Sequence, residues 1–241
     1  MAIALRCLAA TYYSGFHIRP HRHRWGQLIY AAAGMMRVRA GGTLWIVPPA
    51  RAVWVPAGAE HEIHGLGDFA MRTLYFAMAT PELPGECCAL DVTPLLRELV
   101  LEAVELCPID ADDEPAMRLT RVAIDRIAAA RALPLSLPLP RDPRALRLAE
   151  RLQGEPSLQA ELAELARDAG ASPRTIQRLF LAETGLPFSQ WRLRLRLLHA
   201  ATLLGEGRSV TEAGLEAGYA GTSAFIAAFR KQFGVTPARL G

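Results

Sequence analysis

The feature that most restricts the fold of this chain is an internal repeat in its second half. Each copy has a small residue, a glycine four positions later, a phenylalanine, a second glycine and a proline. The copies are Ala166, Gly170, Phe180, Gly185, Pro187 and Gly214, Gly218, Phe229, Gly234, Pro237. The phenylalanines and the second glycines share one sequence offset. Self-similarity of this kind predicts two copies of one structural unit.

The residue types in each copy predict two short helices joined by a tight turn. The first glycine of a copy suits the left-handed backbone that ends a helix. Ser172 caps a new helix that has Pro173 at its first position, and Gly221 or Thr222 takes the capping role in the second copy. Two helices joined in this way form a helix-turn-helix, whose second helix enters the major groove of DNA.

The stretch after Pro143 is predicted to be almost entirely helical, because apolar residues recur there at helical spacing. The expected helices cover residues 144–152, 158–169, 173–184, 188–204, 210–217 and 222–233. The helix over 188–204 joins the two helix-turn-helix units. Residues 141–241 carry 14 basic side chains against 10 acidic ones, whereas residues 1–140 carry 13 against 14. A basic C-terminal part fits a polyanionic partner.

The helix over 173–184 has an outward face suited to reading bases. Ile176, Leu179 and Phe180 form its buried stripe. The residues left outside are Arg174, Thr175, Gln177 and Arg178. Arginine pairs with guanine and glutamine with adenine in the major groove. We expect these four side chains to contact bases or phosphates, and the alternative is a solvated helix face.

The helix over 222–233 presents a poorer outward face. Phe225 and Phe229 point inward. The outward polar residues are Thr222, Ser223, Arg230 and Lys231. Ile226 and Ala227 also point outward but cannot donate hydrogen bonds through their side chains. Either they touch a thymine methyl, or this helix chiefly holds the DNA backbone through Arg230.

Residues 1–80 are predicted to form β structure. Short apolar runs lie between glycine and proline turn signals at 27–30, 35–38, 43–47, 52–55, 61–64 and 69–78. Many short strands with such turns are typical of a sandwich or barrel. Helices are expected at 93–106 and 116–132, and the prolines of 133–143 predict a stiff extended spacer. The predicted domains are therefore residues 1–140 and 141–241.

The C-terminal domain resembles the AraC/XylS family of bacterial transcription regulators. The matching stretches are SPRTIQRLFLAETGLPFSQW, RLRLLHAATLL and GYAGTSAFIAAFRKQFGVTPARL. The resemblance implies double-stranded DNA as a partner, RNA polymerase as another if the protein is an activator, and an N-terminal domain that senses an effector or forms a homodimer. It puts Arg174, Gln177 and Arg178 where family members contact bases. Ala227 stands where some members carry a base-contacting arginine.

The N-terminal domain resembles a cupin. Its first motif consists of Gly15, His21, Arg22, His23, Gln27 and Gly34, at the cupin spacing throughout. Its second motif consists of Pro56, Ala57, Gly58 and His61. Gln27 stands where cupins usually have glutamate, and Ala50 and Gly65 replace the usual opening glycine and closing asparagine of the second motif. The implied fold class is α+β, a cupin-like β-barrel with flanking helices followed by an all-α domain.

The cupin resemblance makes His21, His23, Gln27 and His61 the candidate ligands. Alternation along a strand puts His21 and His23 on one face, and His61 would come from a neighbouring strand. Three imidazoles suit zinc, nickel, copper or iron, with the amide oxygen of Gln27 as a weak fourth ligand. Two alternatives remain open: these side chains line a metal-free pocket for an organic effector, or they satisfy hydrogen bonds in the core.

These features predict a sequence-specific DNA-binding transcription regulator controlled by a small-molecule or metal effector in the cupin-like domain. The alternative is a metal-dependent cupin enzyme, an oxygenase or isomerase with a helical appendage. The replaced glutamate and the lack of a general acid or base in the motifs argue against an enzyme.

The cysteines and the lack of long apolar runs predict the cellular compartment. Cys7, Cys87, Cys88 and Cys107 form no CxxC pair and are interpreted as reduced thiols. The sequence has neither a signal-peptide-like start nor a run long enough to span a membrane. We therefore expect a cytoplasmic protein without membrane attachment.

Overall fold

The computed structural model describes residues 3–49, 51–77, 80–130, 132–133, 136–233 and 236–239. Ala50 of the second cupin-like motif, Pro134 of the predicted spacer and Gly234 of the repeat lie outside these residues, as does the end of the run 69–78. The contacts divide the chain into two compact units, one made of residues 1–41 and 45–136 and the other of residues 42–44 and 137–241. None of the helices in the described ranges combines the length and hydropathy of a membrane-spanning segment.

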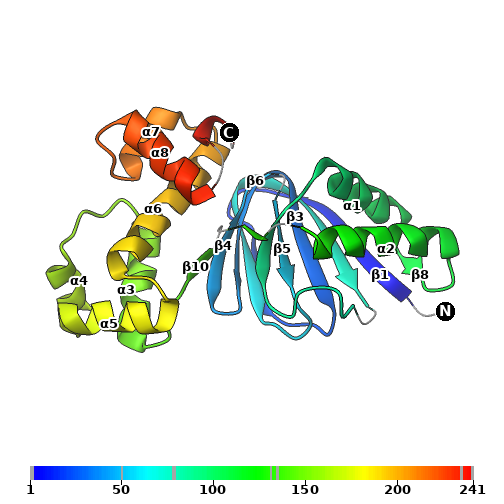
Figure 1. Cartoon of the computed structure of the whole chain (residues 1–241), viewed down its shortest axis with the longest axis horizontal. Helices are drawn as coiled ribbons and strands as arrows, with labels where there is room; N and C mark the ends of the chain where they lie inside the picture. Colours follow the sequence, from blue (N-terminus) through cyan, green and yellow to red (C-terminus); the bar gives the residue numbers. More distant parts are fainter. Residues whose placement is uncertain are drawn as a thin grey trace. The chain divides into compact units, whose positions relative to one another are not determined.

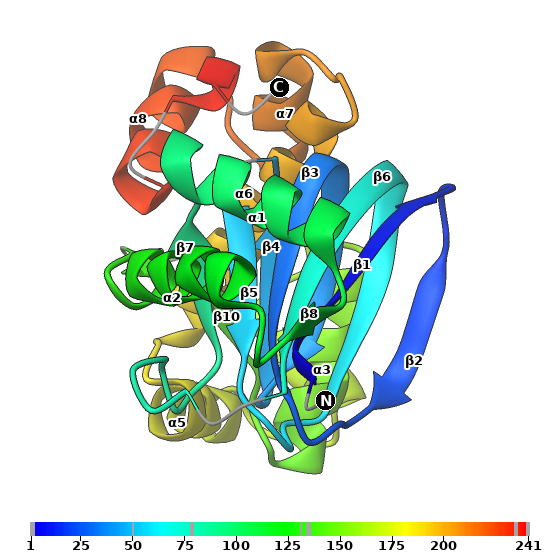
Figure 2. The same cartoon turned by 90° about the vertical axis from the view of Figure 1, so that its right-hand side faces the viewer.

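The N-terminal unit is built on an antiparallel sheet (Figures 1 and 2). The strands are β1 (Ile3–Tyr12), β2 (His17–His21), β3 (Gly26–Ala40), β4 (Thr43–Val47), β5 (Arg51–Val55), β6 (His61–Phe76), β7 (Cys88–Asp91), β8 (Ile109–Asp110), β9 (Ala132–Leu133) and β10 (Ser136–Pro138). The main order in the described residues is β8-β1-β6-β3-β5-β7-β9, and β2 also pairs with β6. With the helical C-terminal unit, this sheet confirms the predicted α+β class.

Strands β3 and β6 are each longer than the sequence suggested. The runs 27–30 and 35–38 belong to one strand, and so do the runs that begin at 61 and 69. Gly34 does not end a strand as predicted, because it lies at a shift in the β3–β6 register. Its φ is +65°, and a Cβ there would lie 2.1 Å from the backbone oxygen of Asp68. A glycine bulge therefore continues the strand where a turn was expected.

Two helices cover one face of the sheet, α1 (Pro94–Leu106) and α2 (Glu114–Ala128), as Figure 2 shows. The helix α1 begins after Thr93, whose hydroxyl accepts the amide of Leu96. The helix α2 begins and ends earlier than predicted. The apolar cluster between helices and sheet includes Leu28, Tyr30, Trp54, Leu74, Phe76, Leu96, Val100, Met117 and Ile124. Alternation then turns Gln27 and Thr73, the sequence neighbours of Leu28 and Leu74, to the other face.

The interpretation of all four cysteines as reduced thiols is wrong for one pair. Cys7 on β1 and Cys107, the residue after α1, form a disulfide with their Cα atoms 5.8 Å apart. The two lie 100 positions apart in sequence, so no local spacing announces the bond. Cys87 and Cys88 are free, and burial raises the pKa of Cys87 to about 11.

The C-terminal unit consists mainly of helices. They are α3 (Pro143–Gly154), α4 (Leu162–Asp168), α5 (Pro173–Thr184), α6 (Phe188–Gly205), α7 (Val210–Glu216), α8 (Thr222–Phe233) and the short 3-10 helix η1 (Pro237–Arg239). The bounds predicted for α5 and α8 are confirmed. The helix α4 begins four residues later than predicted. Arg196 and Arg192 on α6 donate to the carbonyls of Leu158 and Ala160, which holds the segment before α4 in a non-helical conformation.

The two copies of the repeat end their first helices in the same way. After α4, Gly170 has a φ of +72° and Ala171 donates its amide to the carbonyl of Ala166 at 2.9 Å. After α7, Gly218 has a φ of +83° and Tyr219 donates to Gly214 at 3.0 Å. These are the bonds of a Schellman motif. The repeat in sequence is therefore a repeat in backbone hydrogen bonding, and both helix-turn-helix units are formed.

We expect Gly34→Ala to destabilise the N-terminal unit far more than Gly58→Ala. Both glycines have positive φ, but a Cβ at Gly58 would meet nothing within 4 Å. The control should lose about 1–2 kcal/mol for the left-handed backbone alone, and Gly34→Ala should lose roughly 1–3 kcal/mol more because the Cβ meets the Asp68 carbonyl. Urea unfolding followed by circular dichroism measures both. Equal losses would contradict the close approach at Gly34.

Candidate functional site

The outward face of α5 carries the side chains predicted to contact DNA. Arg174, Gln177 and Arg178 are exposed, whereas Ile176 and Phe180 are fully buried. Thr175 is half-buried, and its hydroxyl lies 2.9 Å from the Oγ of Ser172. Ser172 in turn accepts the Thr175 amide as the N-cap of α5. Three of the four residues are thus free to meet DNA, while Thr175 also takes part in the cap.

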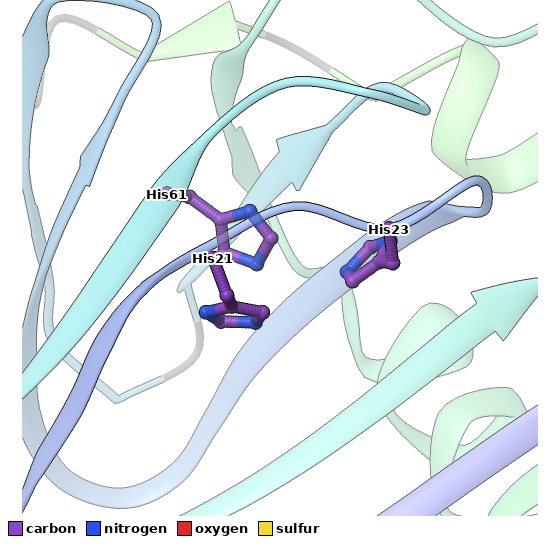
Figure 3. Close-up of side chains that lie close together, drawn as sticks. All are labelled: His21, His23 and His61. Carbon is purple, nitrogen blue, oxygen red and sulfur yellow. The ribbon is translucent and has the colours of Figure 1, made fainter.

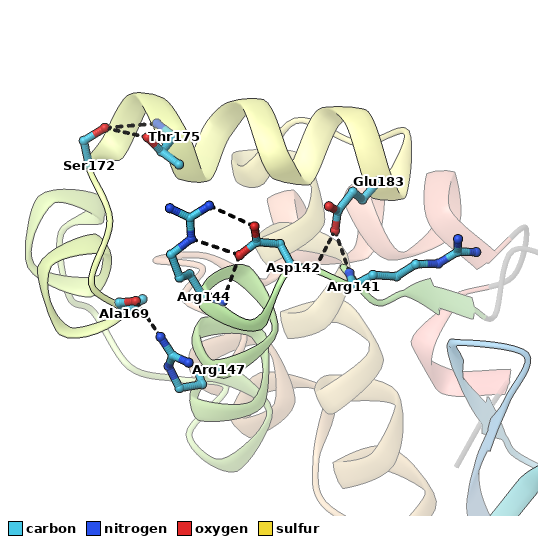
Figure 4. Close-up of polar contacts among 8 residues, drawn as sticks. All are labelled: Arg141, Asp142, Arg144, Arg147, Ala169, Ser172, Thr175 and Glu183. Carbon is cyan, nitrogen blue, oxygen red and sulfur yellow. Dashed lines mark hydrogen bonds and ion pairs between the residues drawn. The ribbon is translucent and has the colours of Figure 1, made fainter.

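The C-terminal end of α5 is tied to the start of the C-terminal unit (Figure 4). Glu183 on α5 accepts the backbone amides of Arg141, at 2.6 Å, and Asp142, at 2.9 Å. Asp142 caps α3 and pairs with Arg144, whose hydrogen bonds lower the pKa of Asp142 to about 2. Arg147 on α3 donates to the carbonyl of Ala169 at 3.1 Å, beside the turn before α5. The position of α5 is therefore set at both ends.

A groove of about 580 Å³ runs beside α5 and the first half of α6. Gln177 and Leu181 line it from α5, and Arg192 and Arg196 from α6. Sequence reasoning gave the α6 arginines no role. The structure uses both to bind carbonyls of the segment before α4, so these two basic side chains help to position the first helix-turn-helix.

The hollow beside the outward face of α8 is more open and more apolar than the groove beside α5. Ser223, Arg230 and Lys231 are exposed, whereas Thr222 and Ile226 are half-buried. Ser223, Ile226, Ala227, Arg230, Lys231 and Thr236 line a hollow of about 700 Å³. The carbonyl of Gly221 accepts the amide of Phe225 at 3.3 Å, which makes Gly221 the N-cap residue of α8. The two basic side chains lie in the last turn of α8.

Three histidines predicted as ligands come together in the N-terminal unit (Figure 3). His21 ends β2, His61 begins β6, and His23 lies between β2 and β3. His21 and His23 therefore do not alternate along one strand as predicted. One ring nitrogen from each histidine lies within 4.8 Å of the other two. The cluster has the size of a metal site.

Backbone carbonyls fix which nitrogen of each ring carries the proton. The Nδ1 atoms of His21, His23 and His61 lie 2.9, 2.8 and 3.0 Å from the carbonyl oxygens of Arg19, Trp25 and Ala59. A carbonyl oxygen only accepts, so each Nδ1 must donate. In the neutral rings the Nε2 atoms then keep their lone pairs. This is the arrangement in which protein histidines bind metals.

Gln27 joins the cluster through a chain of hydrogen bonds. The Thr73 hydroxyl donates to the carbonyl of Leu28 at 2.9 Å and accepts from Nε2 of Gln27 at 2.8 Å. The amide oxygen of Gln27 is thereby turned toward Nε2 of His23, 3.0 Å away. Two atoms that both bear lone pairs face each other when His23 is neutral. Either a proton or a metal ion between them relieves that contact.

His61 is the most enclosed of the three rings. It is 1% exposed, and its Nε2 is buried without a hydrogen-bond partner. Burial lowers the pKa of His61 to about 4, and the neighbouring His21 and His23 add to that effect. The ring is therefore neutral at neutral pH. A buried lone pair without a partner is costly in a folded protein, and a metal ion would satisfy it.

Comparison with known proteins covers both units. Residues 3–104 match the AraC-like ligand binding domain, and residues 165–240 match a helix-turn-helix domain. The HTH-type transcriptional regulator NimR of Escherichia coli is 34% identical over 91% of this chain and 80% of its own length. RipA of Corynebacterium glutamicum is 43% identical over 42% of this chain and 30% of its own length. The virulence regulon transcriptional activator VirF of Yersinia enterocolitica is 25% identical over 89% of this chain and 79% of its own length.

Replacing Arg178 by alanine should weaken binding to an operator selected from randomised DNA by about 1–3 kcal/mol. The loss should shrink on DNA changed at the one base pair that Arg178 reads. Fluorescence anisotropy at fixed salt measures it, and Arg126→Ala, an exposed arginine on α2, is the control. An equal loss on all sequences would assign Arg178 to phosphate contact.

Glu183→Ala should speed amide hydrogen exchange at Arg141 and Asp142. The variant removes the carboxylate that accepts both amides. Because hydrogen bonds to charged groups are worth about 1.5–3 kcal/mol, exchange should rise about tenfold or more. Glu164→Ala, which changes an exposed carboxylate on α4, is the control. Unchanged exchange in Glu183→Ala would show that the contact does not persist in solution.

Proposed function

The chain belongs to the AraC family of DNA-binding transcription regulators, and from this premise we propose that a transition-metal ion in its ligand-binding domain controls sequence-specific DNA binding. His21, His23 and His61 hold the ion, with the amide oxygen of Gln27 as a fourth contact. Two observations carry the proposal: all three Nδ1 atoms face backbone carbonyls, which leaves each Nε2 its lone pair, and one ring nitrogen of each histidine lies within 4.8 Å of the other two.

The donor set limits the ions that fit. Three neutral imidazoles and an amide oxygen suit zinc, nickel, copper or iron and disfavour magnesium or calcium. When bound, such an ion would place a positive charge among the three imidazole nitrogens and the amide oxygen. The carbonyls of Arg19, Trp25 and Ala59 orient the rings from behind, as hydrogen-bond partners of metal-bound histidines do.

The cluster takes its ligands from three parts of the N-terminal unit. His21 lies on β2, His61 on β6 and His23 in the connection that leads to β3. An ion held by all three favours the conformations in which these segments are close. A ligand changes an equilibrium only through such a difference in affinity between states, so the ion acts on DNA binding by favouring one of these conformations.

On DNA, we assign base contacts to α5 and backbone contacts to α8. The exposed Arg174, Gln177 and Arg178 support the first assignment, and Arg230 and Lys231 support the second. The relative VirF is named as a transcriptional activator, which favours activation through RNA polymerase over repression.

We further propose a homodimer through α1 and α2. Leu95 and Leu106 on α1 and Val122 on α2 are 53%, 46% and 42% exposed. The two helices pack together, and burying these side chains against a second copy would remove apolar surface from water.

The metal proposal predicts that zinc, nickel, copper or ferrous iron changes the operator affinity of the full chain. His23→Ala combined with His61→Ala should lower the bound metal by one equivalent and abolish this change, because two of the three imidazoles are lost. His199→Ala, which removes the histidine of the C-terminal unit, is the matched control. Elemental analysis after dialysis and fluorescence anisotropy on selected DNA give the two readouts.

Two results would contradict the metal proposal. In the first, the variant without His23 and His61 keeps the full response to metal. In the second, the native chain holds no transition metal and its operator affinity changes only with an organic compound. The second result would support an organic effector at the same side chains.

A further inference from the structure

A second cluster of ligand-type side chains lies on the same two strands. His17 Nε2 is 3.2 Å from Oε2 of Glu62, and His64 Nε2 is 3.6 Å from the same oxygen. The two imidazole rings are stacked, with centroids 3.7 Å apart and planes inclined by 17°. One ligand atom from each of the three residues lies within 4.8 Å of the other two. The three donors converge as a metal site requires.

The register of β2 against β6 puts this cluster on the face opposite the first one. His17 pairs with His64 and Ile18 with Ile63, but the register shifts before His21, which pairs with His61. Paired residues of antiparallel strands share a face, and His61 and His64 lie on opposite faces of β6. The extra residue in β2 therefore separates two histidines that plain alternation would put together.

We propose that His17, Glu62 and His64 form a second transition-metal site, independent of the His21, His23 and His61 site. Two imidazoles and one carboxylate are a donor set for zinc, nickel or ferrous iron. The side chains of His17, Glu62 and His64 are 35%, 16% and 30% exposed, so an ion can enter and keep water as its remaining ligand.

The residues around Glu62 orient its carboxylate and also lower the affinity of the second site for a metal ion. Nε of Arg39 lies 3.5 Å from Oε1 of Glu62, which leaves Oε2 to face both imidazoles. Arg37 on β3 lies opposite His64 in the register. These positive charges oppose a cation, so the second site should bind metal more weakly than the first.

A metal at the second site would hold β2 in place. In the described residues, β2 pairs with β6 and its side chains are largely exposed. The site takes one ligand from β2 and two from β6. An ion there cross-links the two strands and stabilises the bound conformation by mass action.

Zinc stoichiometry of the full chain tests the proposal. The free thiols are first removed by Cys87→Ser and Cys88→Ser, because thiolates bind zinc. Equilibrium dialysis against zinc, followed by elemental analysis, should give two equivalents for this parent and for the His199→Ala control. His17→Ala with His64→Ala should lower the value to one, and so should His23→Ala with His61→Ala.

The proposal is overturned if the variant without His17 and His64 binds as much zinc as the parent. Failure of the first site has a different signature: the variant without His17 and His64 then binds none, while the variant without His23 and His61 still binds one. Should the alanine variants unfold by circular dichroism, Glu62→Gln replaces them. It keeps the side-chain shape and should lose the second equivalent, whereas Glu60→Gln, at an exposed neighbour, should keep it.

Discussion

Strand β6 is the element on which both candidate metal sites depend. It pairs with β1, β2 and β3, so its position is fixed from both sides. Because side chains alternate along a strand, its odd-numbered residues His61 and Thr73 face the first cluster. Of its even-numbered residues, Leu74 lies in the apolar cluster under α1 and α2, and Glu62 and His64 lie in the second cluster. One strand thus contributes residues to the apolar core and to two separate polar clusters.

Local signals in the sequence were enough for much of the fold. The Ser172 cap and the helix-ending Gly185 set the observed bounds of α5, since these signals act within one turn of the chain. Motif spacing predicted that His21, His23, Gln27 and His61 form one cluster, and they lie close together in the structure. Whether they hold metal stays a prediction.

The features that escaped prediction depend on pairing between distant segments. The Cys7–Cys107 disulfide forms because β1 and the end of α1 meet, 100 positions apart. His17, Glu62 and His64 do not stand out in the sequence, because plain alternation puts His17 and His21 on one face. Only the register shift in β2 separates them. Bulges change the parity of everything that follows in a strand. Pro20, which lies between Ile18 and His21 where the register shifts, is the one residue type in β2 that could have indicated this bulge.

The two helix-turn-helix units have the same backbone turns. Their second helices, α5 and α8, are held in place by different contacts. Ser172 caps α5 with its side chain and Glu183 ties its far end to the amides of Arg141 and Asp142. The residue before α8 is Gly221, which has no side chain to cap the helix. Base reading needs side chains held close to one geometry, whereas phosphate contact tolerates more freedom. The difference in support therefore agrees with the difference in exposed side chains. Glu183 has a second role. The two residues whose amides it accepts, Arg141 and Asp142, lie near the start of the DNA-binding unit.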